Sequence, residues 1–125
     1  MKNTIGKMLA IMACAAMFQP ATATAAPLPR PAAFAMCASC HQTAKNGRSG
    51  LGPNLWGIGG RVSGTMSGFN YSPALKKAAI RWDRNSLIAF SSNPRAKVPG
   101  TRMPYAGQKD PKKAAAIADY LMSLK

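Results

Sequence analysis

The sequence contains a single histidine, no glutamate and only three aspartates, set against 17 lysines and arginines. These shortages exclude several kinds of site. One histidine cannot supply two imidazole ligands to the same metal ion. No glutamate is present to act as a general acid or base. Three cysteines in 125 residues also exclude a small scaffold held together by many disulfides.

Residues 1–25 have the layout of a secretory signal peptide. Two lysines precede an apolar stretch over residues 8–18, and a small-residue pattern of the Ala-x-Ala type ends at Ala25. The apolar stretch is too short for a bilayer core, which takes ~20 residues, so we interpret it as cleaved and not as a membrane anchor. Cys14 lies in this stretch and is removed with the signal peptide. We therefore expect export to the periplasm, with residues 26–125 as one mature domain.

The mature chain is strongly basic. Two of the 17 basic residues lie in the signal peptide, which leaves 15 against three aspartates and a net charge of +12. A field of this strength attracts acidic protein surfaces and, more weakly, anionic membrane surfaces. No nucleic-acid-binding motif is present, so nucleic acid is not an expected partner. About a hundred residues suit one small domain, which we expect to be a monomer.

The segment Cys37-Ala38-Ser39-Cys40-His41 is the most informative motif. Two cysteines separated by two residues and followed at once by histidine are typical of a c-type haem attachment site. Half of a zinc site is one alternative, but zinc needs two more ligands, and the sequence has no second cysteine pair or histidine. A thioredoxin-like pair is another, but it belongs in a βαβ pattern that is absent here. The motif therefore favours haem.

The remaining pattern predicts short helices separated by long loops, with no strand. A proline or a polar cap followed by proline marks most of the starts. The expected elements are a short segment from Pro31 to Cys37, a loop from Gly47 to Gly68, a helix from Pro73 to Ala78 capped by Ser72, a helix capped by Asp83 and stopped by Asn93-Pro94, and a last helix starting at Asp110-Pro111. Four apolar residues of the last helix recur at the spacing of one buried face, namely Ala114, Ile117, Leu121 and Leu124.

A second iron ligand must come from a methionine, because no other histidine exists. Met36 adjoins the attachment cysteine, and Met122 has the position of a helix-packing residue. Met66 lies in a loop of serine and glycine. Met103 lies in a segment braced by prolines, which restrict the backbone. We therefore expect Met103 to be the ligand, with Met66 as the alternative. A thioether ligand favours ferrous iron and raises the reduction potential.

From Phe34 to the C-terminus the chain resembles class I cytochrome c, in the mitochondrial-type branch with its bacterial periplasmic relatives. The resemblance rests on the attachment motif, Trp82 and five short blocks, which are GPNL at 52–55, GR at 60–61, GFNYS at 68–72, NP at 93–94 and PGTRMPYAG at 99–107. It implies an all-α class I cytochrome c fold, with short helices and long loops wrapped around one haem c. The haem is attached through Cys37 and Cys40, and its iron is ligated by His41 and Met103.

The resemblance also implies roles for further residues. Pro53 would accept a hydrogen bond from the outer nitrogen of His41. Residues matching the partners of a buried haem propionate are Arg61, Tyr71 and Trp82, and Thr101 matches a hydroxyl near the other propionate. A positive ring for docking acidic redox partners at the haem edge comprises Arg48, Arg95, Arg102 and Lys109, with Tyr105 as the aromatic residue over that edge.

Three residues depart from the family pattern. Phe90 stands where a tyrosine donates to the methionine sulfur, which by itself lowers the potential. Leu75 replaces a polar asparagine, which makes the pocket drier and acts in the opposite direction. Arg30 stands where a glycine lies at the crossing of the terminal helices, so we expect weaker packing there.

The sequence thus predicts a periplasmic monohaem one-electron carrier between a donor complex or dehydrogenase and a terminal oxidase or reductase. No catalytic residue is expected. One alternative is an electron-accepting subunit bound permanently to one periplasmic dehydrogenase. A small haem peroxidase is the other, and it is disfavoured because no distal acid-base group is available.

Overall fold

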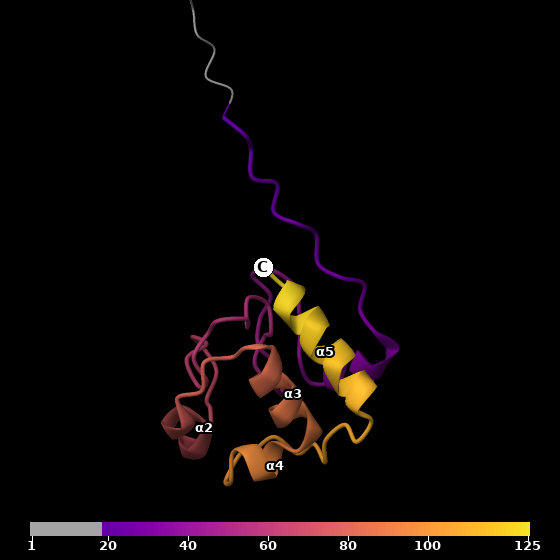
Figure 1. The fold of residues 1–125 in the computed structure, drawn as a ribbon. Helices are drawn as coiled ribbons and strands as arrows, with labels where there is room; N and C mark the ends of the chain where they lie inside the picture. Colours follow the sequence, from indigo (N-terminus) through magenta and orange to yellow (C-terminus); the bar gives the residue numbers. More distant parts are fainter. Residues whose placement is uncertain (1–18) are drawn as a thin grey trace, which may run out of the picture.

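The computed structural model describes residues 19–125. The charged start and the apolar stretch of the expected signal peptide fall within residues 1–18 and lie outside the described residues. Residues 19–30 are extended and exposed, and they lead away from the folded body (Figure 1). Ala25, the expected end of the signal peptide, lies in this exposed segment, and cleavage there stays a prediction.

The folded body is built from short helices and long connecting loops. In residues 19–125 there is no strand, and the one isolated antiparallel bridge joins Val62 and Arg81. The predicted all-α class is therefore confirmed. No helix in this described part is long and apolar enough to cross a bilayer. The elements are a 3-10 helix η1 (Ala32–Phe34), α1 (Ala35–Ala38), α2 (Pro73–Ala78), α3 (Arg84–Ser92), α4 (Pro94–Lys97) and α5 (Pro111–Ser123).

Three predicted helix starts are confirmed by their caps. The hydroxyl of Ser72 accepts a hydrogen bond from the Leu75 N–H (3.1 Å) at the start of α2. At the start of α3, Asp83 forms a reciprocal capping box with Ser86. The carboxylate of Asp110 accepts from the Lys112 N–H (2.9 Å) at the start of α5. These contacts satisfy backbone donors that have no partner inside the helix.

The helix α4 was not predicted. Asn93 ends α3, as expected, but its side chain also accepts a hydrogen bond from the Ala96 N–H (3.2 Å). Pro94 occupies the first helical turn of α4, where its missing N–H costs nothing. The same Asn-Pro pair therefore stops one helix and starts another of only four residues.

The core forms where α5 packs on α3 and on the N-terminal helical segment (Figure 1). The expected apolar face of α5 is buried, together with Leu124 at its end. Leu87 of α3 and Phe34 of η1 pack against this face. The rings of Phe34 and Tyr120 meet edge to face, with centroids 5.0 Å apart, an arrangement that aromatic pairs prefer.

The crossing of the terminal helices is retained despite Arg30. Phe34 is 0% exposed at this crossing, so the expected weakening is not seen in its packing. The guanidinium of Arg30 lies over the Phe34 ring, 5.9 Å from its centroid, within the range of a cation–π contact. The Leu28 N–H donates to the hydroxyl of Ser123 (2.9 Å). This hydrogen bond joins the proline-rich segment before η1 to the end of α5.

We predict that Ala79→Gly stabilises the protein. Ala79 follows α2 with φ +48°, in the left-handed region where a Cβ costs about 1–2 kcal/mol. Glycine removes this strain. However, it also loses more conformational freedom on folding than alanine does, which offsets part of the gain. We therefore expect a gain of up to about 1 kcal/mol in the free energy of unfolding. Denaturant unfolding of the mature protein measures it.

The matched control is Ala78→Gly, one residue earlier and still inside α2. Glycine there has no strain to relieve and lowers stability by about 1 kcal/mol. Equal losses in both variants would contradict the strain at Ala79.

Candidate functional site

The two motif cysteines lie on a continuous turn at the end of α1. The N–H groups of Cys40 and His41 both donate to the carbonyl of Cys37, at 3.1 and 2.9 Å. Neither Cys37 nor Cys40 is in a disulfide. Burial raises the pKa of the Cys37 thiol. A thioredoxin-like reactive cysteine needs a lowered pKa, so this environment disfavours that alternative.

The ring of His41 is fixed by Pro53. Its Nδ1 lies 2.8 Å from the Pro53 carbonyl oxygen. Since a carbonyl only accepts, Nδ1 carries the hydrogen and donates it. Burial lowers the pKa of His41, and the hydrogen bond to Pro53 opposes this in part. A neutral ring protonated at Nδ1 leaves Nε2 with a free lone pair, which is the form that binds a metal. The expected contact between His41 and Pro53 is therefore present.

Gly52 packs directly against the same ring. A Cβ added at Gly52 would lie 2.6 Å from Nδ1 of His41, closer than non-bonded heavy atoms approach. The Gly52 N–H donates to the carbonyl of Cys40 (2.9 Å). Only glycine therefore allows this backbone to lie flat beside the imidazole while bonded to the attachment turn.

Asn54 holds the loop that carries Gly52 and Pro53. Its side chain is 2% exposed. Its amide donates to the carbonyls of Ala44 (3.0 Å) and Gly47 (2.7 Å), and its oxygen accepts from the Trp56 N–H (2.8 Å). In the sequence, Asn54 stands out only as part of the GPNL block. A polar amide inside a glycine-rich loop is the signal that points to such a cross-link.

Three residues assigned to a propionate lie close together. The backbone N–H of Trp82 donates to the backbone carbonyl of Arg61 (2.9 Å). The guanidinium of Arg61 donates to the carbonyls of Asn54 and Trp56, both at 3.2 Å. Burial raises the pKa of Tyr71, and the charge of Arg61 opposes this, so the phenol lies within electrostatic range of the guanidinium. Burial also lowers the pKa of Arg61. A partly buried guanidinium beside a phenol is a suitable partner for a carboxylate.

Met66 lies with this cluster, since a nitrogen of the Arg61 guanidinium is 3.9 Å from its sulfur. Met103 lies elsewhere, in the segment after α4, and is half-buried. Its N–H donates to the hydroxyl of Thr101 (3.3 Å). The hydroxyl expected near the second propionate is therefore bonded to the backbone of the expected ligand.

The segment that carries Met103 is anchored at both ends. Near its start, Arg102 donates to the carbonyl of Asn70 (3.1 Å). At its end, Gly107 has φ +99° and lies so close to the backbone of Ser92 that a Cβ would overlap it. The Gln108 N–H donates to the carbonyl of Ser91 (2.8 Å). A side chain held on such a segment has a restricted position, as a metal ligand requires.

These residues fit a covalent haem. The donor set consists of two free thiols, an imidazole with Nε2 uncommitted, and a thioether on an anchored segment. Partly buried apolar side chains are packed against the core, including Leu75, Ile80 and Phe90. Burial raises the pKa of Tyr105, and the charge of the Cys37 thiolate adds to this, so the two side chains lie within electrostatic range.

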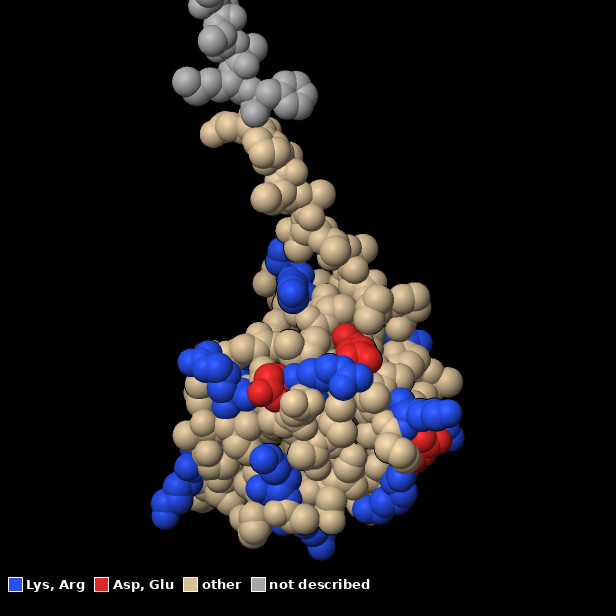
Figure 2. Space-filling view, viewed as in Figure 1, with Lys and Arg blue, Asp and Glu red and all other residues tan. Residues whose placement is uncertain are grey.

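The four residues of the expected docking ring are all exposed, namely Arg48, Arg95, Arg102 and Lys109. Lys109 is held by the carbonyls of Ser92 (3.2 Å) and Ala106 (2.9 Å). Figure 2 shows one face of the molecule, on which basic side chains are widely spread and acidic ones occur in a few places.

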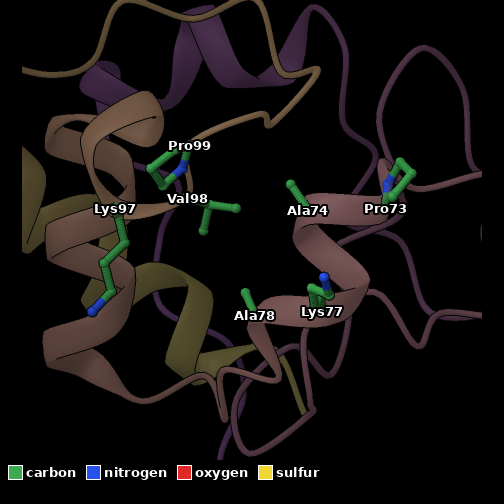
Figure 3. A pocket seen from close by; sticks show the side chains of 7 residues that line it. All are labelled: Pro73, Ala74, Lys77, Ala78, Lys97, Val98 and Pro99. Atoms are coloured by element: carbon green, nitrogen blue, oxygen red, sulfur yellow. The ribbon is translucent and has the colours of Figure 1, made fainter.

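The described residues line two open pockets, and the second of them includes His41. One, of about 490 Å³, lies between α2 and residues 97–99, where Ala74, Ala78 and Val98 point towards the space (Figure 3). The other, of about 410 Å³, is lined by Arg30 and His41, among others. This second pocket lies between Arg30, before η1, and residues 38–44, which include the end of the attachment turn.

Comparison with known proteins agrees with this site. Residues 31–125 match the family model "Cytochrome c". The chain is 40% identical over 94 residues to cytochrome c2 iso-2 of Magnetospirillum fulvum, covering 75% of this chain and 97% of that protein. It is 46% identical to cytochrome c of Chlamydomonas reinhardtii, covering 68% and 76% of the two chains. The structure of cytochrome cH from Methylobacterium extorquens matches with a TM-score of 0.66 at 42% identity, covering 71% and 89%.

The match spans the attachment turn, the helices and the anchored methionine segment. The chain therefore belongs to the cytochrome c family, whose members are electron-transfer proteins with one covalently bound haem c and histidine–methionine ligation of the iron.

Proposed function

We propose that this protein is a periplasmic one-electron carrier. It takes electrons from a donor complex or dehydrogenase and passes them to a terminal oxidase or reductase. Cys37 and Cys40 attach the haem, and His41 and Met103 ligate its iron. The observation that carries the proposal is the His41–Pro53 hydrogen bond of 2.8 Å, because it fixes the ring with Nε2 available to iron.

Haem supplies the redox chemistry, as its iron cycles between the ferrous and ferric states. The protein residues keep the coordination geometry the same in both states. Pro53 and Gly52 fix the imidazole of His41, which would be one ligand of the iron. Thr101 and the anchored ends of the segment hold the backbone of Met103, whose thioether would be the other ligand. A site that changes little between oxidation states needs little reorganisation, which suits an electron carrier.

Arg61, Tyr71 and Trp82 bind one haem propionate in this proposal, and Thr101 lies near the other. The guanidinium of Arg61 is already positioned by two backbone carbonyls. It therefore offsets the cost of burying a carboxylate without having to be ordered first.

The expected signal peptide in residues 1–25 supports the periplasmic location. The layout of residues 1–25 is that of a signal peptide that is cleaved on export. The relatives named cytochrome c2 are bacterial proteins. Acidic redox partners then dock at the haem edge through Arg48, Arg95, Arg102 and Lys109.

We predict that Met103→Ala removes the sixth ligand. The ferric protein then loses its sulfur-to-iron charge-transfer band, and its reduction potential falls by tens of millivolts or more, because the soft thioether no longer favours ferrous iron. Absorption spectra and potentiometry of the matured protein measure both effects.

Met66→Ala is the matched control, since Met66 lies beside Arg61 and is the alternative ligand. It keeps the band. Loss of the band in Met66→Ala with retention in Met103→Ala would reverse the assignment.

We predict that Gly52→Ala destabilises the matured protein by about 1–3 kcal/mol, because the added methyl must displace the imidazole of His41 or the loop. Unfolding by denaturant measures the loss.

Gly50→Ala is its control. A Cβ at Gly50 meets only the Cys40 carbonyl, at 3.7 Å, an ordinary contact. A loss at Gly50 as large as that at Gly52 would mean that loop stiffness, and not the packing on His41, sets the effect.

A further inference from the structure

Met66 differs from the other methionines of residues 19–125 because its sulfur contacts a cationic side chain. A nitrogen of the Arg61 guanidinium lies 3.9 Å from this sulfur. Met36 is 66% exposed, Met122 lies in α5 and packs against the core, and Met103 is the proposed iron ligand. A thioether is only a weak acceptor. The proposed electron transfer gives this contact no role.

The backbone of Met66 is connected to a second residue of the same cluster. Burial raises the pKa of Tyr71, whereas the charge of Arg61 and a hydrogen bond from the Met66 N–H oppose this. Arg61 and Tyr71 are two of the three residues proposed to bind one haem propionate. Met66 therefore contacts both of them, one through its sulfur and the other through its N–H.

A small solute can reach the loop that carries Met66. Its side chain is partly exposed, and the adjacent residues Thr65, Ser67 and Gly68 are exposed. A Cβ added at Gly68 would meet no other atom within 4 Å, so the end of this loop borders open space. A molecule of the size of hydrogen peroxide can thus approach the sulfur without unfolding of the chain.

The reaction open to a thioether at such a place is oxidation to the sulfoxide. A lone pair of the sulfur attacks one oxygen of hydrogen peroxide, the O–O bond breaks, and an S–O bond forms. The sulfur loses two electrons, and the second peroxide oxygen leaves as water after a proton transfer. The side chain becomes polar and gains an oxygen that accepts hydrogen bonds more strongly than sulfur does.

The position of Arg61 suits this oxygen. An S–O bond of about 1.5 Å and an N–H···O distance of about 2.9 Å, meeting at about 120°, place the nitrogen about 3.9 Å from the sulfur. The guanidinium nitrogen already lies 3.9 Å from the sulfur of Met66. Arg61 can therefore donate to a sulfoxide oxygen at its present distance, and a hydrogen bond from a charged donor is a strong one.

We propose that Met66 is a peroxide-sensitive regulatory site, whose oxidation draws the Arg61 guanidinium away from the haem propionate and lowers the reduction potential. This rests on the proposed binding of the propionate by Arg61. The guanidinium already donates to the carbonyls of Asn54 and Trp56, so few of its donors remain. A donor taken by the sulfoxide leaves the negative charge less compensated, which favours ferric iron. Enzymatic reduction of the sulfoxide restores the original state.

The first part of the test measures where peroxide reacts. Matured, haem-loaded protein carrying Met36→Leu, which removes an exposed methionine outside the cluster, is treated briefly with hydrogen peroxide. Catalase stops the reaction, and mass spectrometry of tryptic peptides measures the sulfoxide at each methionine. We expect Met66 to be oxidised at least about fivefold faster than Met122, which packs against the core. Oxidation of Met122 as fast as that of Met66 would overturn the proposal.

The second part measures the consequence without an oxidant. Met66→Gln carries a carbonyl oxygen close to the place of the sulfoxide oxygen, and Met66→Leu is the matched control without an acceptor. The equilibrium constant for reduction is measured against a mediator of fixed potential. We expect it to fall about threefold in Met66→Gln and in the peroxide-treated protein. We expect Met66→Leu to keep the untreated value and to lose the response to peroxide.

Three results of this second part would overturn the proposal. Equal shifts in Met66→Gln and Met66→Leu would trace the effect to loss of the sulfur. A peroxide response retained in Met66→Leu, or one that methionine sulfoxide reductase does not reverse, would place the reactive group elsewhere. Untreated protein without bound haem would refute the electron-carrier function itself, whereas haem-loaded protein with an unchanged equilibrium constant in every sample would refute only the regulation.

Discussion

The hydrogen bond between His41 and the carbonyl of Pro53 is the interaction on which the rest of the site depends. It fixes both the orientation and the protonated nitrogen of the ring in one contact. The loop that supplies the carbonyl is in turn held by Asn54, through two carbonyls and one N–H. A long loop without regular structure thereby acts as a rigid support. Its glycine at position 52 leaves room for the ring.

The segments that carry Met103 and Arg61 are fixed in the same way by other residues. Neither the segment of Met103 nor the loop of Arg61 is helical. Each is fixed by bonds to distant backbone, such as Arg102 to Asn70 and Arg61 to Asn54. Residues of α5 and α3, together with Phe34, account for most of the core, and loop residues such as Leu55 and Trp82 complete it. The proposed ligands therefore lie on loops positioned by a helical frame, a common division of roles in proteins.

Much of this arrangement is predictable from the sequence, because it depends on local rules. The attachment motif, the caps at Ser72, Asp83 and Asp110, and the buried face of α5 each follow from residue type and spacing. The contact from His41 to Pro53 was expected only from the family resemblance.

Other features depend on distant contacts that spacing does not encode. The helix α4 is a single turn, too short to show periodicity. The left-handed backbone at Ala79 carries no sequence signal, because alanine normally favours a right-handed helix. The packing of Phe34 beneath Arg30 also differed from expectation, because the guanidinium stacks over the ring and does not displace it. The hydrogen bonds of the Asn54 side chain depend on how the loop folds back on itself, which the sequence does not show.

Because the chain has a single histidine, nitrogen-15 NMR of histidine-labelled, reduced protein tests the central claim most directly. It reports one imidazole without assignment ambiguity. The account predicts a slowly exchanging proton on Nδ1 of His41, protected by the Pro53 carbonyl, and no proton on Nε2, the proposed ligand of the iron. A proton on Nε2, or a rapidly exchanging one on Nδ1, would contradict it.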